Sequence, residues 1–108
     1  MKLIVAIIQD EDVAHVVESL NEARVQVTKL ATKGGFLSSK NTTLLAGVES
    51  DRVKETVEII EKNSKVRLQK TSIPSTYGSM NGLMMNPVDI SVGGGTIFVL
   101  DVEQFYKF

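Results

Sequence analysis

The segment with the greatest potential for recognition chemistry spans residues 34–43 and contains Gly34-Gly35-Phe36-Leu37, followed by Asn41-Thr42-Thr43. Paired glycines allow backbone amides to approach a ligand closely. Phe36 offers a flat aromatic face and Leu37 an apolar flank. Asn41 can donate and accept hydrogen bonds at once, the pattern that pairs with adenine. From these residue types alone, an ordinary hairpin with Phe36 packed on the core is as good an interpretation, because Gly and Asn are common turn formers.

Two residues outside this loop fit the same hypothesis of a nucleotide site. Thr28 lies on the preceding predicted strand, and its hydroxyl is suited to a phosphate oxygen. Gly47 lies on the following strand and would leave room for a planar ring. The candidate chemistry is therefore binding of a nucleotide by polar and aromatic contacts.

Catalytic and metal-binding patterns are missing from the sequence. His15 is the single histidine and is expected at a helix surface, and there is no cysteine. Asp10 and Asp12 are interpreted as helix N-caps rather than as cation ligands. The glycine-rich segments lack the Walker lysine and the dinucleotide-binding pattern. We therefore expect no enzyme activity, no metal and no cofactor.

The overall charge argues against a nucleic-acid polymer as partner. Lys and Arg number 12 against 13 Asp and Glu, a net charge of −1, whereas phosphate neutralisation needs a basic surface. The predicted central strands, 3–8 and 42–48, also lack the aromatic residues on which RNA-binding sheets stack bases. No run approaches the ~20 apolar residues of a membrane span. We expect a cytoplasmic protein.

Hydrophobic periodicity predicts nine successive segments. These are a strand over 3–8, a helix over 13–23, strands over 25–32 and 42–48, a helix from Ser50 or Asp51 to Asn63, a short strand over 66–70, an irregular stretch over 71–86, and strands over 88–92 and 96–102. The order βαββαβ, with extra strand material near the end, predicts one α+β domain over 1–108 with the ferredoxin-like fold. The first and last strands are apolar on both faces, so we expect a second copy to cover the face that the helices leave open.

The chain resembles the PII-like cyclic di-AMP receptor family of Gram-positive bacteria. The resemblance rests on 2–7 with Gln9-Asp10, on 27–32, on the GGFL and NTT motifs, on Val92-Gly93-Gly94 with 96–99, and on the ending Gln104-Phe105-Tyr106-Lys107-Phe108. It implies a PII-like homotrimer with a short T-loop at 34–41 and a long B-loop at 71–86. It also implies that cyclic di-AMP binds in clefts between subunits and signals to an unknown downstream protein.

The resemblance assigns roles to individual positions of this sequence. Thr28 would contact a phosphate. One adenine would be held by Gly35, Phe36, Leu37 and Asn41, with Gly47 beneath it. Gly94 of a neighbouring subunit would close the pocket.

The sequence departs from the family pattern on the phosphate side. Gln26 stands where the family carries Arg, and losing one charge-assisted hydrogen bond costs about 1.5–3 kcal/mol. Arg24, two residues earlier and expected on the same side of the strand, is one candidate replacement for the charge. Lys40 stands where the family has Gly before Asn-Thr-Thr and could also meet a phosphate. In the B-loop, Pro74 to Gly78 and three methionines replace the expected Pro-Met-Gly-Gly stretch.

Two other functions compete with a cyclic di-AMP sensor. The first is a diverged PII-like interaction module that no longer binds the dinucleotide and docks a protein through Tyr77 and the loop residues Met80, Met84 and Met85. The second is an acylphosphatase-like hydrolase. That activity needs an arginine-bearing anion loop after the first strand, where this chain has the acidic run 9–12.

Overall fold

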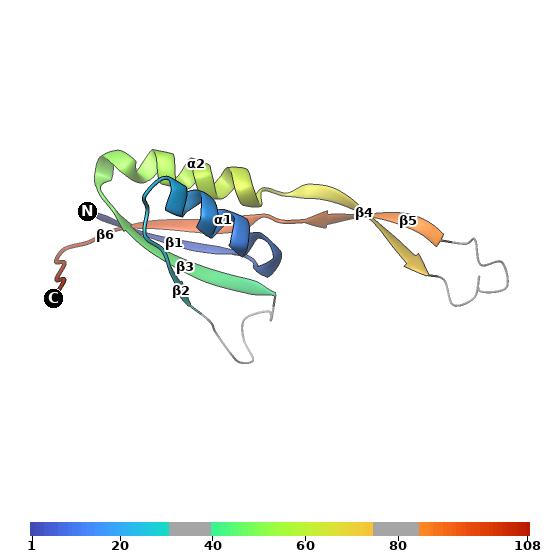
Figure 1. Cartoon of the computed structure of the whole chain (residues 1–108), viewed down its shortest axis with the longest axis horizontal. Helices are drawn as coiled ribbons and strands as arrows, with labels where there is room; N and C mark the ends of the chain where they lie inside the picture. The colour runs from blue at the N-terminus through green and yellow to red at the C-terminus, as the bar shows by residue number, and fades with distance from the viewer. Residues whose placement is uncertain (31–39, 75–84) are drawn as a thin grey trace.

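In the computed structural model, two helices lie on one face of an antiparallel sheet, and a two-stranded ribbon extends from one end of it (Figure 1). The structure describes residues 1–30, 40–74 and 85–108. The elements are β1 (Lys2–Gln9), α1 (Asp10–Glu22), β2 (Thr28–Leu30), β3 (Asn41–Val48), the 3-10 turn η1 (Ser50–Arg52), α2 (Val53–Ser64), β4 (Arg67–Pro74), β5 (Met85–Val92) and β6 (Gly95–Asp101).

The main sheet has the strand order β2-β3-β1-β6, and every neighbouring pair is antiparallel. This is the order that a βαββαβ chain adopts when its two helices cross the same face. The strands β4 and β5 form the separate ribbon, inserted between α2 and β6. The predicted ferredoxin-like α+β fold is confirmed.

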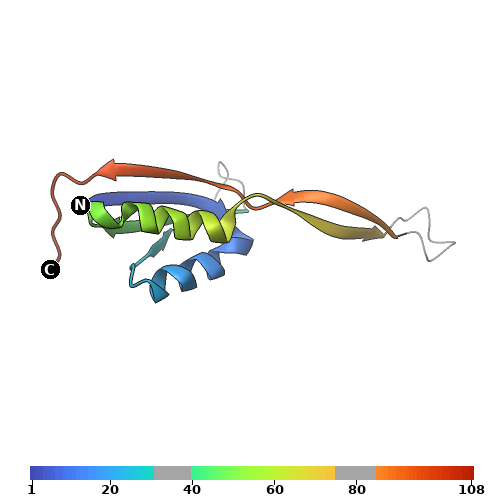
Figure 2. The same cartoon turned by 90° about the horizontal axis from the view of Figure 1, so that it is seen from above.

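The core lies between the helices and one face of the sheet (Figure 2). Successive side chains of a strand point to opposite faces, so Ile4, Ala6 and Ile8 of β1 all face the helices and are buried. On α1, Val13, Val16 and Leu20 recur at the spacing of one helix face and are buried, as the periodicity predicts. Within α2, Ile60 is 2% exposed, and Val53 and Val57 pack against the same cluster.

The opposite face of the sheet is apolar and is not covered by either helix. This face is formed by the odd-numbered residues of β1 and by the residues that pair with them across the sheet, because directly opposed residues point to the same side. They include Leu3, Val5, Ile7, Leu30, Leu45, Phe98 and Leu100. Phe98 is 52% exposed, Leu100 47% and Leu30 42%. The prediction that the helices leave one apolar face open is confirmed.

The helix starts differ from the predicted N-caps. The cap of α1 is Gln9, without a side-chain hydrogen bond, and Asp10 and Asp12 belong to the first turn of the helix. Ser50 begins a 3-10 turn, and α2 itself starts at Val53 after Arg52. The prediction was wrong because acidic residues are favoured both at the cap and in the first turn, near the positive end of the helix dipole.

The second strand is shorter than its predicted range at its N-terminal side. Arg24 has a φ of +61°, and the amide of Val25 donates to the carbonyl of Leu20 at 2.8 Å, a bonding pattern that closes the end of α1. Strand β2 therefore begins only at Thr28. Arg24 is a turn residue, and its predicted place on the same side of a strand as Gln26 was wrong.

The stretch 71–86, predicted to be irregular, is strand at both of its ends. The ribbon continues to Pro74 on β4 and resumes at Met85 on β5, with Thr71 opposite Val88 and Pro74 opposite Met85. The two strands pair only with each other, and those of their residues whose burial the structure describes are exposed apart from Val92. Hydrophobic alternation is then a poor guide to their length.

Candidate functional site

Three of the predicted ligand residues lie on the uncovered face of the main sheet. Thr28 of β2 is opposite Leu45 of β3, and Asn41 and Gly47 lie an even number of positions from Leu45 on the same strand. Side chains at these positions point to one side of the sheet. The uncovered face therefore combines an exposed hydroxyl, a half-buried carboxamide and a glycine within one apolar surface.

Gly47 leaves open space on this face. A methyl group built on its Cα would meet only the sulfur of Met1, at 3.9 Å. Gly47 is also exposed, although it lies within a strand that is otherwise buried or half-buried. A flat ring can therefore approach the backbone of β3 here.

Asn41 is held in place by the turn that follows β1. It pairs with Gln9 in the register of β1 and β3. The next residue of the turn, Asp10, donates its amide to the carbonyl of Lys40 at 2.8 Å and accepts a hydrogen bond from the hydroxyl of Thr42. The residues on both sides of Asn41 are thus bonded to this turn, which holds the backbone of Asn41 in place.

The loop residues Gly34, Gly35, Phe36 and Leu37 lie outside the described residues. The described chain ends at Leu30 of β2 and resumes at Lys40, next to Asn41. These two ends belong to neighbouring antiparallel strands, with Leu30 opposite Thr43. The loop therefore starts and ends beside Asn41, on the part of the sheet that also carries Thr28.

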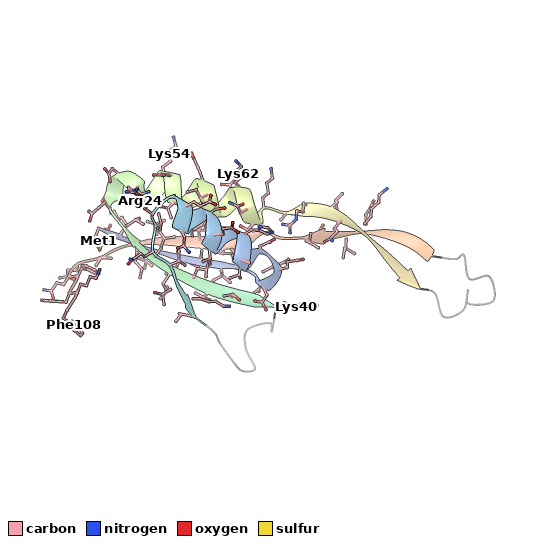
Figure 3. All side chains as sticks on the ribbon, in the orientation of Figure 1. Met1, Arg24, Lys40, Lys54, Lys62 and Phe108 are labelled. Atoms are coloured by element: carbon pink, nitrogen blue, oxygen red, sulfur yellow. The ribbon has the colours of Figure 1, made fainter. Side chains whose placement is uncertain are left out.

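No arginine is present in β2 or in residues 25–27 just before it, where the phosphate contacts of the predicted site would lie. Val25 is buried and Val27 packs against the core, whereas Gln26 and Thr28 are exposed. This alternation puts Gln26 on the side of the chain that carries Thr28. Arg24 and Lys40 lie toward opposite ends of the sheet (Figure 3), so each is near a different end of β3.

Gly94 lies at the other edge of the sheet. It precedes β6, has a φ of +90° and donates its amide to the carbonyl of Ser64. It lines a hollow of about 360 Å³ together with Ile8, Ile60, Val66 and Ile97. Since β2 and β6 are the two outermost strands of the sheet, Thr28 and Gly94 lie on different sides of one subunit.

A group of polar contacts near Gly94 was not anticipated from the sequence. Arg67, the first residue of β4, donates two hydrogen bonds to the carboxylate of Asp12, from Nη2 at 2.7 Å and from Nη1 at 3.3 Å. This hydrogen bond raises the pKa of the Arg67 guanidinium above its ordinary range. Asp12 is 2% exposed, so its charge is nearly desolvated and depends on this partner. The sequence signal, an acidic residue early in a helix, was attributed to capping.

The described residues hold no group of three or more His, Cys, Asp or Glu side chains placed to bind a metal ion. His15 is exposed on α1, as expected. Among the described helices, none has the length and apolar character that crossing a membrane requires.

Comparison with known proteins agrees with this arrangement. A family model described as cyclic-di-AMP receptor matches residues 1–108, the whole chain. The chain belongs to the cyclic-di-AMP receptor family. It is also similar to a solved structure described as a functionally unknown protein from Pediococcus pentosaceus ATCC 25745, with 40% identity and a TM-score of 0.78. That match covers 99% of this chain and 96% of the other.

Membership of this receptor family indicates the class of ligand. Cyclic di-AMP offers two adenine rings and two phosphates. Hydroxyl and carboxamide groups can hydrogen-bond such a ligand, and the described sheet carries the exposed hydroxyl of Thr28, the carboxamide of Asn41 and open space at Gly47. The family is a family of cyclic di-AMP receptors, which supports binding of this dinucleotide by the chain.

Proposed function

We propose that this protein is a homotrimeric sensor that binds cyclic di-AMP in clefts between its subunits. The observation that carries the proposal is the placement of Thr28, Asn41 and Gly47 on one open sheet face of a chain from the cyclic-di-AMP receptor family. The hydroxyl of Thr28 donates to a phosphate oxygen. Asn41, together with Gly35, Phe36 and Leu37 of the T-loop, holds one adenine. Gly47 lies six positions further along β3, roughly 20 Å away at the ~3.3 Å rise of a strand, so its open space serves the other adenine.

The position of Gly94 supports a cleft shared between copies. Gly94 and Thr28 lie at opposite edges of one sheet, so one chain cannot bring them around the same small ligand. The open face between these edges exposes Phe98, Leu100 and Leu30, large apolar side chains that a neighbouring copy would remove from water. In the trimer, Gly94 of one subunit closes the pocket that Thr28 and Asn41 of the next subunit begin.

Binding is converted into a signal by the T-loop and the B-loop. A ligand shifts a conformational equilibrium only if it contacts one conformation better than the other. Phe36 and Leu37 belong to the T-loop, so their contacts with adenine select one arrangement of that loop. The ordered T-loop and B-loop then form the surface that a downstream protein recognises.

Titration calorimetry tests this proposal. We expect cyclic di-AMP to release heat with one site per subunit, and Asn41→Ala and Phe36→Ala each to weaken binding. The control His15→Ala, on the exposed side of α1, should bind as the wild type does. The proposal would be wrong if about 100 µM ligand produced neither heat nor a thermal shift. That concentration would detect even a weak complex with a binding free energy of roughly −5.5 kcal/mol. A pull-down partner insensitive to the nucleotide would then favour the diverged interaction module.

A further inference from the structure

The turn between β1 and α1 is bonded on one side to the base of the ribbon. The side-chain oxygen Oε1 of Gln9 accepts a hydrogen bond from the amide of Gly93 at 2.7 Å. Three residues later, the carboxylate of Asp12 accepts two hydrogen bonds from Arg67 at the start of β4. The turn therefore holds both strands of the ribbon where they leave the body of the protein.

The same turn is bonded on its other side to the end of the T-loop. The amide of Asp10 donates to the carbonyl of Lys40, and the carboxylate of Asp10 accepts from Thr42. Gln9 is itself the register partner of Asn41. Gln9 thus contacts the Asn41 side of the subunit through its backbone and the Gly93–Gly94 side through its side chain.

Hydrogen bonds rather than solid packing hold the turn and the ribbon base together at this point. A hollow of about 450 Å³ lies between them, and its lining includes Gln9, Glu11, Lys40, Gln69 and Ser91. On the side away from Gln9, the glycine turn is packed closely against the segment between α2 and β4. A methyl group on Gly93 would lie 2.5 Å from the carbonyl oxygen of Lys65 and 2.6 Å from Arg67 Nη1. Backbone contacts fix the following residues, because the amide of Gly94 donates to the carbonyl of Ser64 and Gly95 pairs with Ile8 of β1. The Gln9 hydrogen bond is the side-chain contact that adds the amide of Gly93 to these backbone bonds.

We infer that Gln9 is a positioning residue that links two neighbouring dinucleotide sites: its side chain holds the Gly93–Gly94 turn, which closes the next subunit's pocket, at a set distance from Asn41 of its own subunit's pocket. This inference rests on the proposed function, because Gly94 and Asn41 are its two candidate ligand residues. Gln9 acts without contacting the dinucleotide. Loss of its acceptor leaves the amide of Gly93 without this partner and loosens the start of the turn, so binding has to restore part of its order.

The test compares two variants of the full-length protein. Gln9→Met keeps the length of the side chain and removes the acceptor. Gln9→Glu combined with Glu11→Gln restores an acceptor at position 9 and keeps the net charge of the turn. Glu11 is exposed, and Glu58→Gln, on the exposed side of α2, is the matched surface control. The readouts are the Kd for cyclic di-AMP by calorimetry and the hydrogen-exchange rate of the Gly93 amide, with melting temperature and sedimentation to verify folding and assembly.

Gln9→Met should exchange the Gly93 amide faster and weaken binding about two- to tenfold, the equivalent of one neutral hydrogen bond. The double variant should recover both values. A Kd for Gln9→Met equal to that of the wild type overturns the inference while leaving the proposed function intact. So does weakened binding that the double variant fails to recover. If the wild type itself binds no cyclic di-AMP, the proposed function fails and the inference falls with it.

Discussion

The guanidinium of Arg67 lies 2.7 Å from the carboxylate of Asp12, and this ion pair joins the first turn of α1 to the base of the β4–β5 ribbon. The two residues are separated by 55 positions. Asp12 is 4% exposed at its side chain and Arg67 is 43% exposed, so the pair is asymmetric: the carboxylate is desolvated and the guanidinium remains in contact with water.

This asymmetry predicts that losing the exposed partner, Arg67, destabilises the fold. Arg67→Met should lower the melting temperature clearly, because it leaves a buried carboxylate without a partner. Arg67→Lys should retain much of the stability by keeping a positive charge near Asp12. The matched control is Lys2→Met, which removes the ion pair with exposed Asp101 and should change the melting temperature little. Equal losses for Arg67→Met and Lys2→Met in calorimetry at neutral pH would contradict the prediction.

The pair of Lys2 and Asp101 predicts a pH effect of known sign. A hydrogen bond from Lys2, and then its charge, lowers the pKa of Asp101 below the ordinary value of 3.8. Because the pKa is lower in the folded state, the pair stabilises the fold above about pH 4, and this contribution is lost as the pH falls through the folded-state pKa. Carboxyl-carbon NMR should show the Asp101 titration moving to higher pH in Lys2→Met. It should be unchanged in the control Lys54→Met, on the exposed side of α2.

Two glycines predict opposite effects of the same substitution. Gly93→Ala should destabilise the fold by at least ~1–2 kcal/mol, since φ is +84° and the new methyl group would meet the Lys65 carbonyl. Gly47→Ala has room for its methyl group and should not lower stability. It should nevertheless weaken cyclic di-AMP binding, because it fills the space proposed for adenine. Denaturant unfolding and calorimetry measure the two effects. A Gly47→Ala variant that binds normally would remove Gly47 from the site.

The open sheet face predicts the assembly state. Phe98→Asp places a charge at a 52% exposed apolar position of this face, and we expect it to convert the proposed trimer to monomers in sedimentation velocity. The control Leu68→Asp changes a residue that is 71% exposed on the ribbon and should leave the trimer intact. A wild-type protein that sediments as a monomer at micromolar concentration would contradict the assembly itself.

The phosphate side of the site predicts a gain of affinity. Gln26→Arg introduces a guanidinium on the side of the chain that carries Thr28, and it should tighten cyclic di-AMP binding about ten- to a hundredfold. We further expect Arg24→Gln to weaken binding in the wild-type background and to matter much less when residue 26 is Arg. This double-mutant comparison measures whether Arg24 supplies the missing charge. Unchanged affinity in Gln26→Arg would argue that residue 26 does not face a phosphate.

Much of the fold could be predicted because its signals are local. The spacing of Val13, Val16 and Leu20 defines a helix face, and the short uninterrupted apolar run over 3–8 is typical of a strand with two apolar faces, whatever the rest of the chain does. The ribbon was predicted too short for the converse reason. Its strands pair only with each other, and those of their residues whose burial the structure describes are exposed apart from Val92, so burial gives their sequence little periodicity.

The sequence by itself determined the order of the elements, the open apolar face and the family motif around Asn41. These properties follow from side-chain periodicity and from the residue types of a short segment. Only the tertiary structure decided that Asp12 is the buried partner of Arg67, that Gln9 accepts from Gly93, and that Arg24 ends a helix. A polar side chain in a turn can hydrogen-bond several backbone groups of neighbouring residues. Which partner it takes in the folded protein depends on the distant segment that the fold brings beside it.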